Sequence, residues 1–210
     1  MPAEAKRTYD VADLDPVEAY KLGSGLTVPR PIGWIGTISA SGVYNLAPYS
    51  FFNMVAMYPP TFVVAPTLDG RKDTLDNLES TGVFTVNIVT EETVAAMNAS
   101  AAAFPADTDE FTECGLTAVR SSTSDAPMVA EAVANFECSV VQTVLVGEGV
   151  DGHEASGMLV IGEAQRIHVA ERVSDDNFHI DPHELRAVGR LAGGWYSRTS
   201  NALFKAERPD

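Results

Sequence analysis

A chain of 210 residues, of which 45% are hydrophobic and 20% charged, is long enough to bury a core, and we expect a single domain over residues 1–210. Its formal net charge of -15, with only 14 basic residues, argues against nucleic acid or an anionic membrane as the main partner. No apolar run approaches the roughly 20 residues of a membrane-spanning helix, and the N-terminal "MPAEAKRTYD" lacks the basic-then-apolar order of a signal peptide, so we expect a cytoplasmic location.

Segments rich in Val, Ile, Thr and Phe indicate that strands dominate the chain. In the first of them, alternation places Ile32 and Trp34 on one face, with Ile38 as a further candidate for it. The stretch "SASGVYN" after it is typical of a hairpin turn, with Gly42 able to adopt a positive φ. The predicted strands are Gly33–Ser39, Val43–Ala47, Thr61–Ala65, Val83–Val89, Leu116–Arg120, Asn135–Gly147 and Met158–Val169.

Two helices are predicted from their start and stop signals. In "DTLDNLEST" we expect Asp73 as N-cap and Gly82 as the stop, and in "TEETVAAMNASAAA" we expect Thr90 as N-cap. Because strands outnumber helices and short turns join most of them, the pattern favours an all-β-dominated fold. We expect an antiparallel barrel with a few covering helices rather than a parallel α/β sheet.

Several familiar motifs are missing from the sequence: there is no G-x-G-x-x-G, no Walker-type phosphate loop and no G-x-S-x-G elbow. His179 and His183 have i, i+4 spacing, but Pro182 between them favours a helix that starts there, so we expect no metal site. Cys114 and Cys138 fit no zinc spacing, and we expect two buried thiols rather than a disulfide.

One loop and one basic pair together suit a flat cofactor that carries a phosphate. Such a ligand needs apolar walls for its ring, amides or backbone groups for the polar edge, and hydroxyls, N–H groups and a cation for the phosphate. Aromatic residues after a proline also pack into cores, and an Arg-Lys pair also occurs in solvated turns, so the residues alone leave both interpretations open. The candidate residues are Ser50, Phe51, Phe52, Asn53, Arg71, Lys72 and Thr74.

Five segments resemble the flavin reductase-like proteins with an FMN-binding split barrel. They are "PRPIGWIGTIS" (29–39), "NLAPYSFFN" (45–53), "PPTFVV" (59–64), "RKDTLDNLESTGVFTVNIV" (71–89) and "VGRLAGGWYSRT" (188–199), and they follow the order of that family. The resemblance implies a six-stranded antiparallel Greek-key split barrel, a homodimer, and one FMN per subunit near the dimer interface.

The resemblance also assigns roles to individual residues. It places Thr37 beside the flavin, and it gives the ring and ribityl chain to the loop Ser50, Phe51, Phe52 and Asn53. It gives the phosphate to Arg71, Lys72 and Thr74. Two further candidates are Asn87, whose strand position suits a structural role equally well, and Tyr196, in a Gly-rich segment that could cover the site. Trp34 is expected in the core or in an interface rather than on the ring.

Flavin carries hydride chemistry itself, so the protein needs only to position it and admit a partner, and no catalytic residue is identified. The leading hypothesis is an NAD(P)H-dependent FMN reductase, with NADH or NADPH as electron donor and with reduced flavin passing to a separate oxygenase. Three alternatives remain open: a flavoprotein oxygenase, a non-enzymatic FMN electron carrier, and a flavin-free interaction barrel. The sequence indicates no preference between NADH and NADPH.

Overall fold

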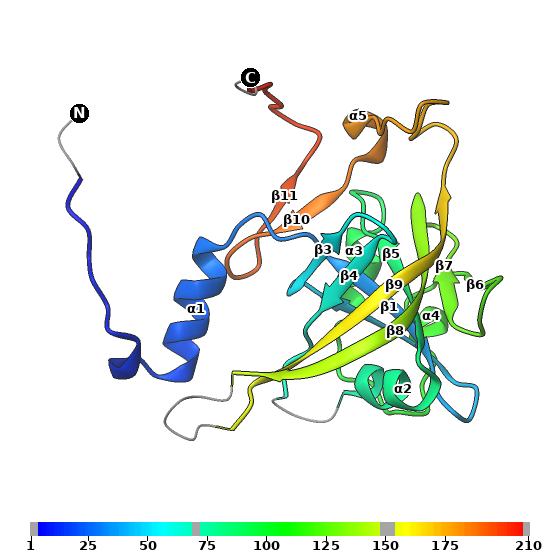
Figure 1. The fold of residues 1–210 in the computed structure, drawn as a ribbon, viewed down its shortest axis with the longest axis horizontal. Coiled ribbons are helices and arrows are strands. Elements are labelled where there is room, and N and C mark those ends of the chain that lie inside the picture. The colour runs from blue at the N-terminus through cyan, green and yellow to red at the C-terminus, as the bar shows by residue number, and fades with distance from the viewer. Residues whose placement is uncertain (1–3, 69–71, 148–153, 208–210) are drawn as a thin grey trace.

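The computed structural model describes residues 4–68, 72–147 and 154–207, and a curled antiparallel sheet of seven strands dominates them (Figure 1). The strand order is β2-β1-β5-β8-β9-β4-β3. The seven strands are β1 (Gly33–Ile38), β2 (Tyr44–Tyr49), β3 (Phe52–Ala56), β4 (Thr61–Val64), β5 (Val83–Ile88), β8 (Ala134–Val146) and β9 (Gly157–Val169). Two small ribbons pair β6 (Ala118–Arg120) with β7 (Pro127–Val129), and β10 (Val188–Arg190) with β11 (Tyr196–Arg198).

The connection between β2 and β3 explains why this sheet curls into a barrel. These strands lie at opposite ends of the strand order, yet only Ser50 and Phe51 separate Tyr49 from Phe52. Three Cα-to-Cα steps span at most about 11 Å, so the two outer strands must approach each other at this point. We call the Ser50–Phe51 link and the adjoining ends of β2 and β3 the seam.

The described helices are short and lie outside the sheet (Figure 1). They are the 3-10 helix η1 (Val11–Asp13) and the α-helices α1 (Pro16–Leu26), α2 (Asp73–Thr81), α3 (Val94–Ala99), α4 (Glu110–Glu113) and α5 (Pro182–Leu185). Helix α2 packs on β1 and β2. Helix α1 stands away from the barrel and buries none of its residues, although a capping box at Asp15 and Glu18 fixes its start.

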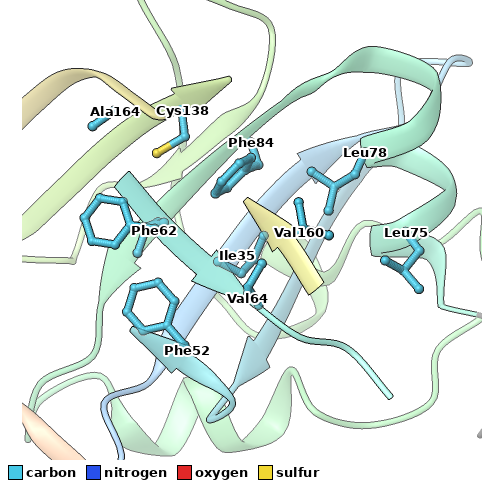
Figure 2. Close-up of a cluster of buried hydrophobic side chains, with 11 residues drawn as sticks. Ile35, Phe52, Phe62, Val64, Leu75, Leu78, Phe84, Cys138, Val160 and Ala164 are labelled. Carbon is cyan, nitrogen blue, oxygen red and sulfur yellow. The ribbon is translucent and has the colours of Figure 1, made fainter. Parts of the chain in front are cut away.

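Two apolar cores lie on opposite faces of β1. Ile35 points into the barrel, where it joins rings from β3, β4 and β5 and two leucines of α2 (Figure 2). Trp34 points outward and packs with Leu46, Met97 and Phe111 under α3 and α4, and its indole N–H donates to Ser100. The predicted shared face of Ile32 and Trp34 is confirmed, because both belong to this outer core.

Close backbone approach explains one glycine of β1. A Cβ at Gly36 would lie 2.3 Å from the carbonyl oxygen of Pro127, so only glycine lets β1 pack against β7 here. In the turn after β1, Gly42 adopts φ +89°, as expected from the hairpin pattern.

The observed elements confirm the all-β-dominated fold class, with seven strands in the main sheet rather than six. Each predicted strand exists, with bounds that differ by up to two residues at either end, whereas η1, α1, α4, β3, β7, β10 and β11 were not predicted. Asp73 is the first residue of α2 and Lys72 is its N-cap, so the predicted cap was wrong by one position; Gly82 ends α2 in the left-handed region, as predicted. Thr90 does not cap α3, because that helix starts at Val94 after Thr93. Among the described residues no helix is long and apolar enough to cross a bilayer.

Candidate functional site

A cavity of about 390 Å³ opens at the seam, within the roughly 300–1,000 Å³ range of small-molecule sites. A second hollow of about 200 Å³ shares Tyr20, Pro48, Tyr49, Ser50 and Ala101 with it, so the two form one cleft, which we call the seam cleft. Its walls come from α1, β2, the seam, the start of α2, the segment 100–104 and the start of α4. The cleft therefore gathers residues that lie far apart in the sequence.

The start of α2 forms a polar end of the cleft. Lys72, Asp73 and Thr74 all line the cavity, and the N–H groups and dipole at the start of a helix favour an anion. The hydroxyl of Thr74 accepts a hydrogen bond of 3.0 Å from the side-chain amide of Asn45. A cation, a hydroxyl and a helix start are the groups that hold a phosphate.

Thr37 lies behind this end of the cleft rather than in its wall. It is fully buried, and its hydroxyl accepts hydrogen bonds from Asn45 (3.1 Å) and Asn77 (3.0 Å). Because Asn45 donates to both Thr37 and Thr74, the three side chains form one fixed network. Thr37 therefore contacts the cavity only indirectly, because it holds Asn45, which lines the cavity and was not among the predicted residues.

Ser50 and Phe51 line the cleft, as the sequence predicted for them. The Phe51 ring packs edge-on against Tyr20 of α1, with ring centroids 6.3 Å apart. The hydroxyl of Ser50 accepts from Nε of Arg30, a buried residue whose remaining donors bind backbone carbonyls of Thr27, Leu191 and Ser24. Arg30 therefore ties the seam to the end of α1 and to the segment after β10.

Three other predicted residues lie outside the cleft in this structure. Phe52 is part of the barrel core, where it stacks on Phe62 (Figure 2). The side chain of Asn53 is exposed on β3 and accepts from the N–H of Met54. Asn87 is fully buried on the outer face of β5, and it donates to the Trp34 carbonyl in a network that suits a structural role.

Tyr196 lines the smaller part of the cleft and donates to Asn98 at 3.2 Å. The guanidinium of Arg190 lies over the Tyr196 ring, 4.6 Å from its centroid, and this cation–π contact orients the ring. The predicted phosphate residue Arg71 lies outside the described residues, so the structure places only Lys72 and Thr74 of that trio at the polar end.

Among the residues that the prediction missed are two whose pKa the cleft shifts strongly, Tyr49 and Glu110. Burial raises the pKa of Tyr49 to about 12, more than its hydrogen bond with Thr74 lowers it, so the phenol stays protonated. Burial also raises the pKa of the Glu110 carboxyl to about 7, against the effect of N–H donors from Glu110 itself and from Leu46. Nothing in "DTDEFTE" separates Glu110 from its acidic neighbours, so only the fold reveals its place.

Other polar groups serve the scaffold. Glu137 is fully buried on β8 and accepts from Ser122, Thr123 and His168, which fastens the loop before β7 to the sheet. Cys138 is buried as expected, whereas Cys114 is only half-buried, and both thiols are free. Among the residues with described positions, no cluster of three or more His, Cys, Asp or Glu side chains suits a metal ion.

Comparison with known proteins identifies the fold and the family. The family model described as "Flavin reductase like domain" matches residues 25–186. The chain belongs to this family. An uncharacterized protein of Aquifex aeolicus (strain VF5) is 38% identical over 191 residues, which are 90% of this chain and 93% of the relative.

Two solved structures are similar over nearly the whole chain. Nitrilotriacetate monooxygenase component B from Bacillus cereus is 32% identical with a TM-score of 0.89, and the match covers 99% of this chain and 100% of that one. The 2-nitrobenzoate 2-nitroreductase NbaA of Pseudomonas fluorescens is 27% identical with a TM-score of 0.85, and the match covers 96% of each chain. Membership of the flavin reductase-like family makes this chain a flavin-related oxidoreductase with a split-barrel fold.

Proposed function

We propose that this protein binds FMN in the seam cleft and reduces it with electrons from NADH or NADPH. The observation that carries the proposal is the composition of the cleft, which combines an aromatic wall at Phe51 and Tyr20 with an anion-binding end at the start of α2. A flavin mononucleotide needs both features, an apolar surface for the ring and cationic or N–H donors for the phosphate. Membership of the flavin reductase-like family supports the same ligand.

In this proposal, Lys72, Thr74 and the N–H groups of α2 hold the phosphate, with Arg71 as a further predicted contact. Phe51 and Tyr20 exclude water from the ring, and Ser50 stays in position through Arg30. The flavin, when bound, supplies the hydride chemistry, so the protein's contribution is binding, orientation and electrostatics. The cleft residues named above accordingly bind and orient the cofactor, and none of them is assigned a chemical step.

We also propose that two copies of the chain pair across β3. This strand ends the sheet order, so no strand among the described residues pairs with its outer edge, and Met54 and Val55 on it are half-exposed. The turn that follows exposes 88% of Met57 and 95% of Tyr58. An exposed apolar edge strand is a surface that association covers, and Phe51 at the seam adjoins it, so a second copy would also border the flavin site.

The downstream acceptor has two candidates. Similarity to a monooxygenase component supports transfer of reduced flavin to a separate oxygenase. Similarity to a nitroreductase supports direct reduction of an organic substrate at the bound flavin. Oxygen-independent consumption of NADH or NADPH that depends on an added nitroaromatic compound would select the second candidate.

The test of the proposed reaction is anaerobic reduction. We expect NADH or NADPH to bleach the visible absorbance of FMN bound to the protein, with dithionite as the positive control. If dithionite bleaches the flavin and neither nucleotide does, the reductase proposal is wrong and an electron carrier or oxygenase takes its place.

The test of the proposed orientation uses Lys72→Met, which keeps most of the side-chain stem and removes the charge. A charge-assisted contact is worth about 1.5–3 kcal/mol, so FMN affinity should fall roughly 10- to 150-fold. Riboflavin, which lacks the phosphate, should bind the variant about as well as it binds the original protein. Lys205→Met removes the same charge at an exposed position outside the cleft and is the matched control. Equal losses for FMN and riboflavin would contradict the assignment.

A further inference from the structure

Glu110 is a buried carboxyl in the wall of the seam cleft. It is the first residue of α4, and only 7% of its surface is exposed. One carboxyl oxygen accepts a 3.1 Å hydrogen bond from the N–H of Leu46, and no cation of the described residues forms an ion pair with it. A buried carboxylate without a counter-ion is costly, and the cost grows when a second anion enters the same cavity.

Glu110 lies at the end of the cleft to which the proposed function assigns the phosphate. Its hydrogen-bond donor Leu46 is adjacent in β2 to Asn45, and Asn45 binds Thr74 at the start of α2. Asp73, which precedes Thr74, lines the same cavity and interacts electrostatically with Glu110. A phosphate held by Lys72 and Thr74 would therefore approach two carboxyl groups.

The groups around Glu110 are mostly acidic or neutral, so they favour the protonated form of its carboxyl. From α2, Asp73 repels the ionised carboxylate, while Lys72 is the cation that lines the cavity. From β2, Tyr49 stays neutral. From α4 itself, Asp109 adds repulsion. Further along the chain, Glu113 is exposed to solvent, and burial raises the pKa of Cys114, so this thiol is neutral too.

We propose that Glu110 takes up a proton from solvent when the phosphate of FMN binds, so that FMN binding is coupled to protonation of this carboxyl. This inference rests on the proposed function. Protonation removes one of the two negative charges that face the phosphate, and the neutral carboxyl gains an O–H donor for an acceptor in the cavity. The Leu46 N–H keeps its partner in either form, so the wall of the cleft need not move.

The coupling predicts a pH dependence whose sign can be stated. Because the free carboxyl has a pKa of about 7, it is half ionised near neutrality, and a ligand that requires the protonated form binds more weakly as pH rises. Between pH 7 and 8.5 FMN affinity should fall by roughly tenfold or somewhat more. The phosphate itself has a second pKa of about 6, so it is dianionic throughout this range and adds little to the trend.

The experiment compares the original protein with Glu110→Gln and Glu113→Gln at pH 7, 7.5, 8 and 8.5, with FMN and riboflavin as probes. Glutamine at 110 imitates the protonated acid, so we expect its FMN affinity to change less than about twofold over the range. Glu113→Gln removes the same charge from an exposed position on the same helix and should retain the pH dependence of the original protein. Riboflavin should show a weaker pH dependence than FMN with the original protein and with Glu113→Gln.

Calorimetry of the original protein in two buffers of different ionisation enthalpy gives a second measurement, which requires no variant to fold. At pH 8 FMN binding should take up close to one proton. Zero uptake, or an equal pH dependence in Glu110→Gln and the original protein, overturns the proposal while leaving FMN binding intact. If none of the proteins binds FMN at any pH, the proposed function is wrong and this proposal fails with it.

Discussion

The two adjacent phenylalanines of the seam should respond differently to truncation. Phe52 is 8% exposed and stacks on Phe62, with ring centroids 5.5 Å apart and planes only 9° from parallel. Phe51 is 42% exposed and borders the cleft with Tyr20. Phe52→Ala therefore removes a core ring, and Phe51→Ala removes part of a ligand wall.

The magnitudes follow from these positions. Truncation of a buried phenylalanine costs about 3–5 kcal/mol. Because Phe52 also borders an apolar cavity of about 680 Å³, its ring already lacks some neighbours, and we expect the lower end, about 3 kcal/mol. For a chain of this size that loss lowers Tm by roughly 6–12 °C. Phe51→Ala should change the free energy of unfolding by about 0.5 kcal/mol or less, because its ring is 42% exposed and lies outside the barrel core.

Thermal unfolding of the FMN-free proteins, followed by circular dichroism, measures the loss of stability, and titration with FMN measures the loss of FMN affinity. We expect Phe51→Ala to keep its Tm and to lose about 2- to 12-fold in FMN affinity, the worth of one aromatic contact. Phe52→Leu, which retains an apolar side chain, should recover part of the Tm lost in Phe52→Ala. If Phe52→Ala kept its Tm and weakened FMN binding as much as Phe51→Ala, Phe52 would be a ligand residue rather than a core residue.

Three further predictions concern the scaffold and assembly. Burial would raise the pKa of Glu137, but hydrogen bonds from Thr123 and His168 outweigh this effect and lower the pKa to about 2. The ionised carboxylate therefore stabilises the fold above about pH 4.5, and this stabilisation is lost as pH falls toward 2. Unfolding measured as a function of acid pH should show that Glu137→Gln lacks this contribution, which is at most about 3 kcal/mol. Gly36→Ala should destabilise the fold by about 1–3 kcal/mol in denaturant unfolding, because the added methyl group meets the Pro127 carbonyl, and an unchanged midpoint would show that β1 and β7 can separate freely. Light scattering at micromolar concentration should give a mass near twice 22.4 kDa, and a monomer mass with FMN bound would exclude the proposed pairing across β3.

Most of the barrel was predictable because its strands carry strong local signals. The long pair β8 and β9 and the strands β1, β4 and β5 are rich in β-branched or aromatic residues, and turn residues bound several of them. Helix α1 was not predictable from periodicity, because it buries no residue and has no apolar stripe to recognise. The unpredicted strands β7, β10 and β11 have only three residues each, too short for alternation to be seen.

The candidate site was predictable where one segment supplies it and unpredictable where the fold assembles it. Ser50 and Phe51 adjoin in sequence, and Lys72 and Thr74 start one helix, so each pair was visible as a local pattern. Tyr20, Asn45 and Glu110 enter from three separate elements, and their place depends on how these elements pack.

The seam explains why the predicted run of four residues divides at Phe52. At Phe52 the chain enters β3, and successive side chains of a strand point to opposite faces, so Phe52 turns into the barrel and Asn53 turns out. Only the two residues outside regular strands, Ser50 and Phe51, are free of this constraint, and both line the cleft. The same link brings the sheet's outer strands together, so the geometry that closes the barrel also forms one wall of the cleft. Changes that loosen closure, such as loss of the Arg30 contacts to Ser50 and to the end of α1, must therefore alter the cleft as well as the stability of the fold.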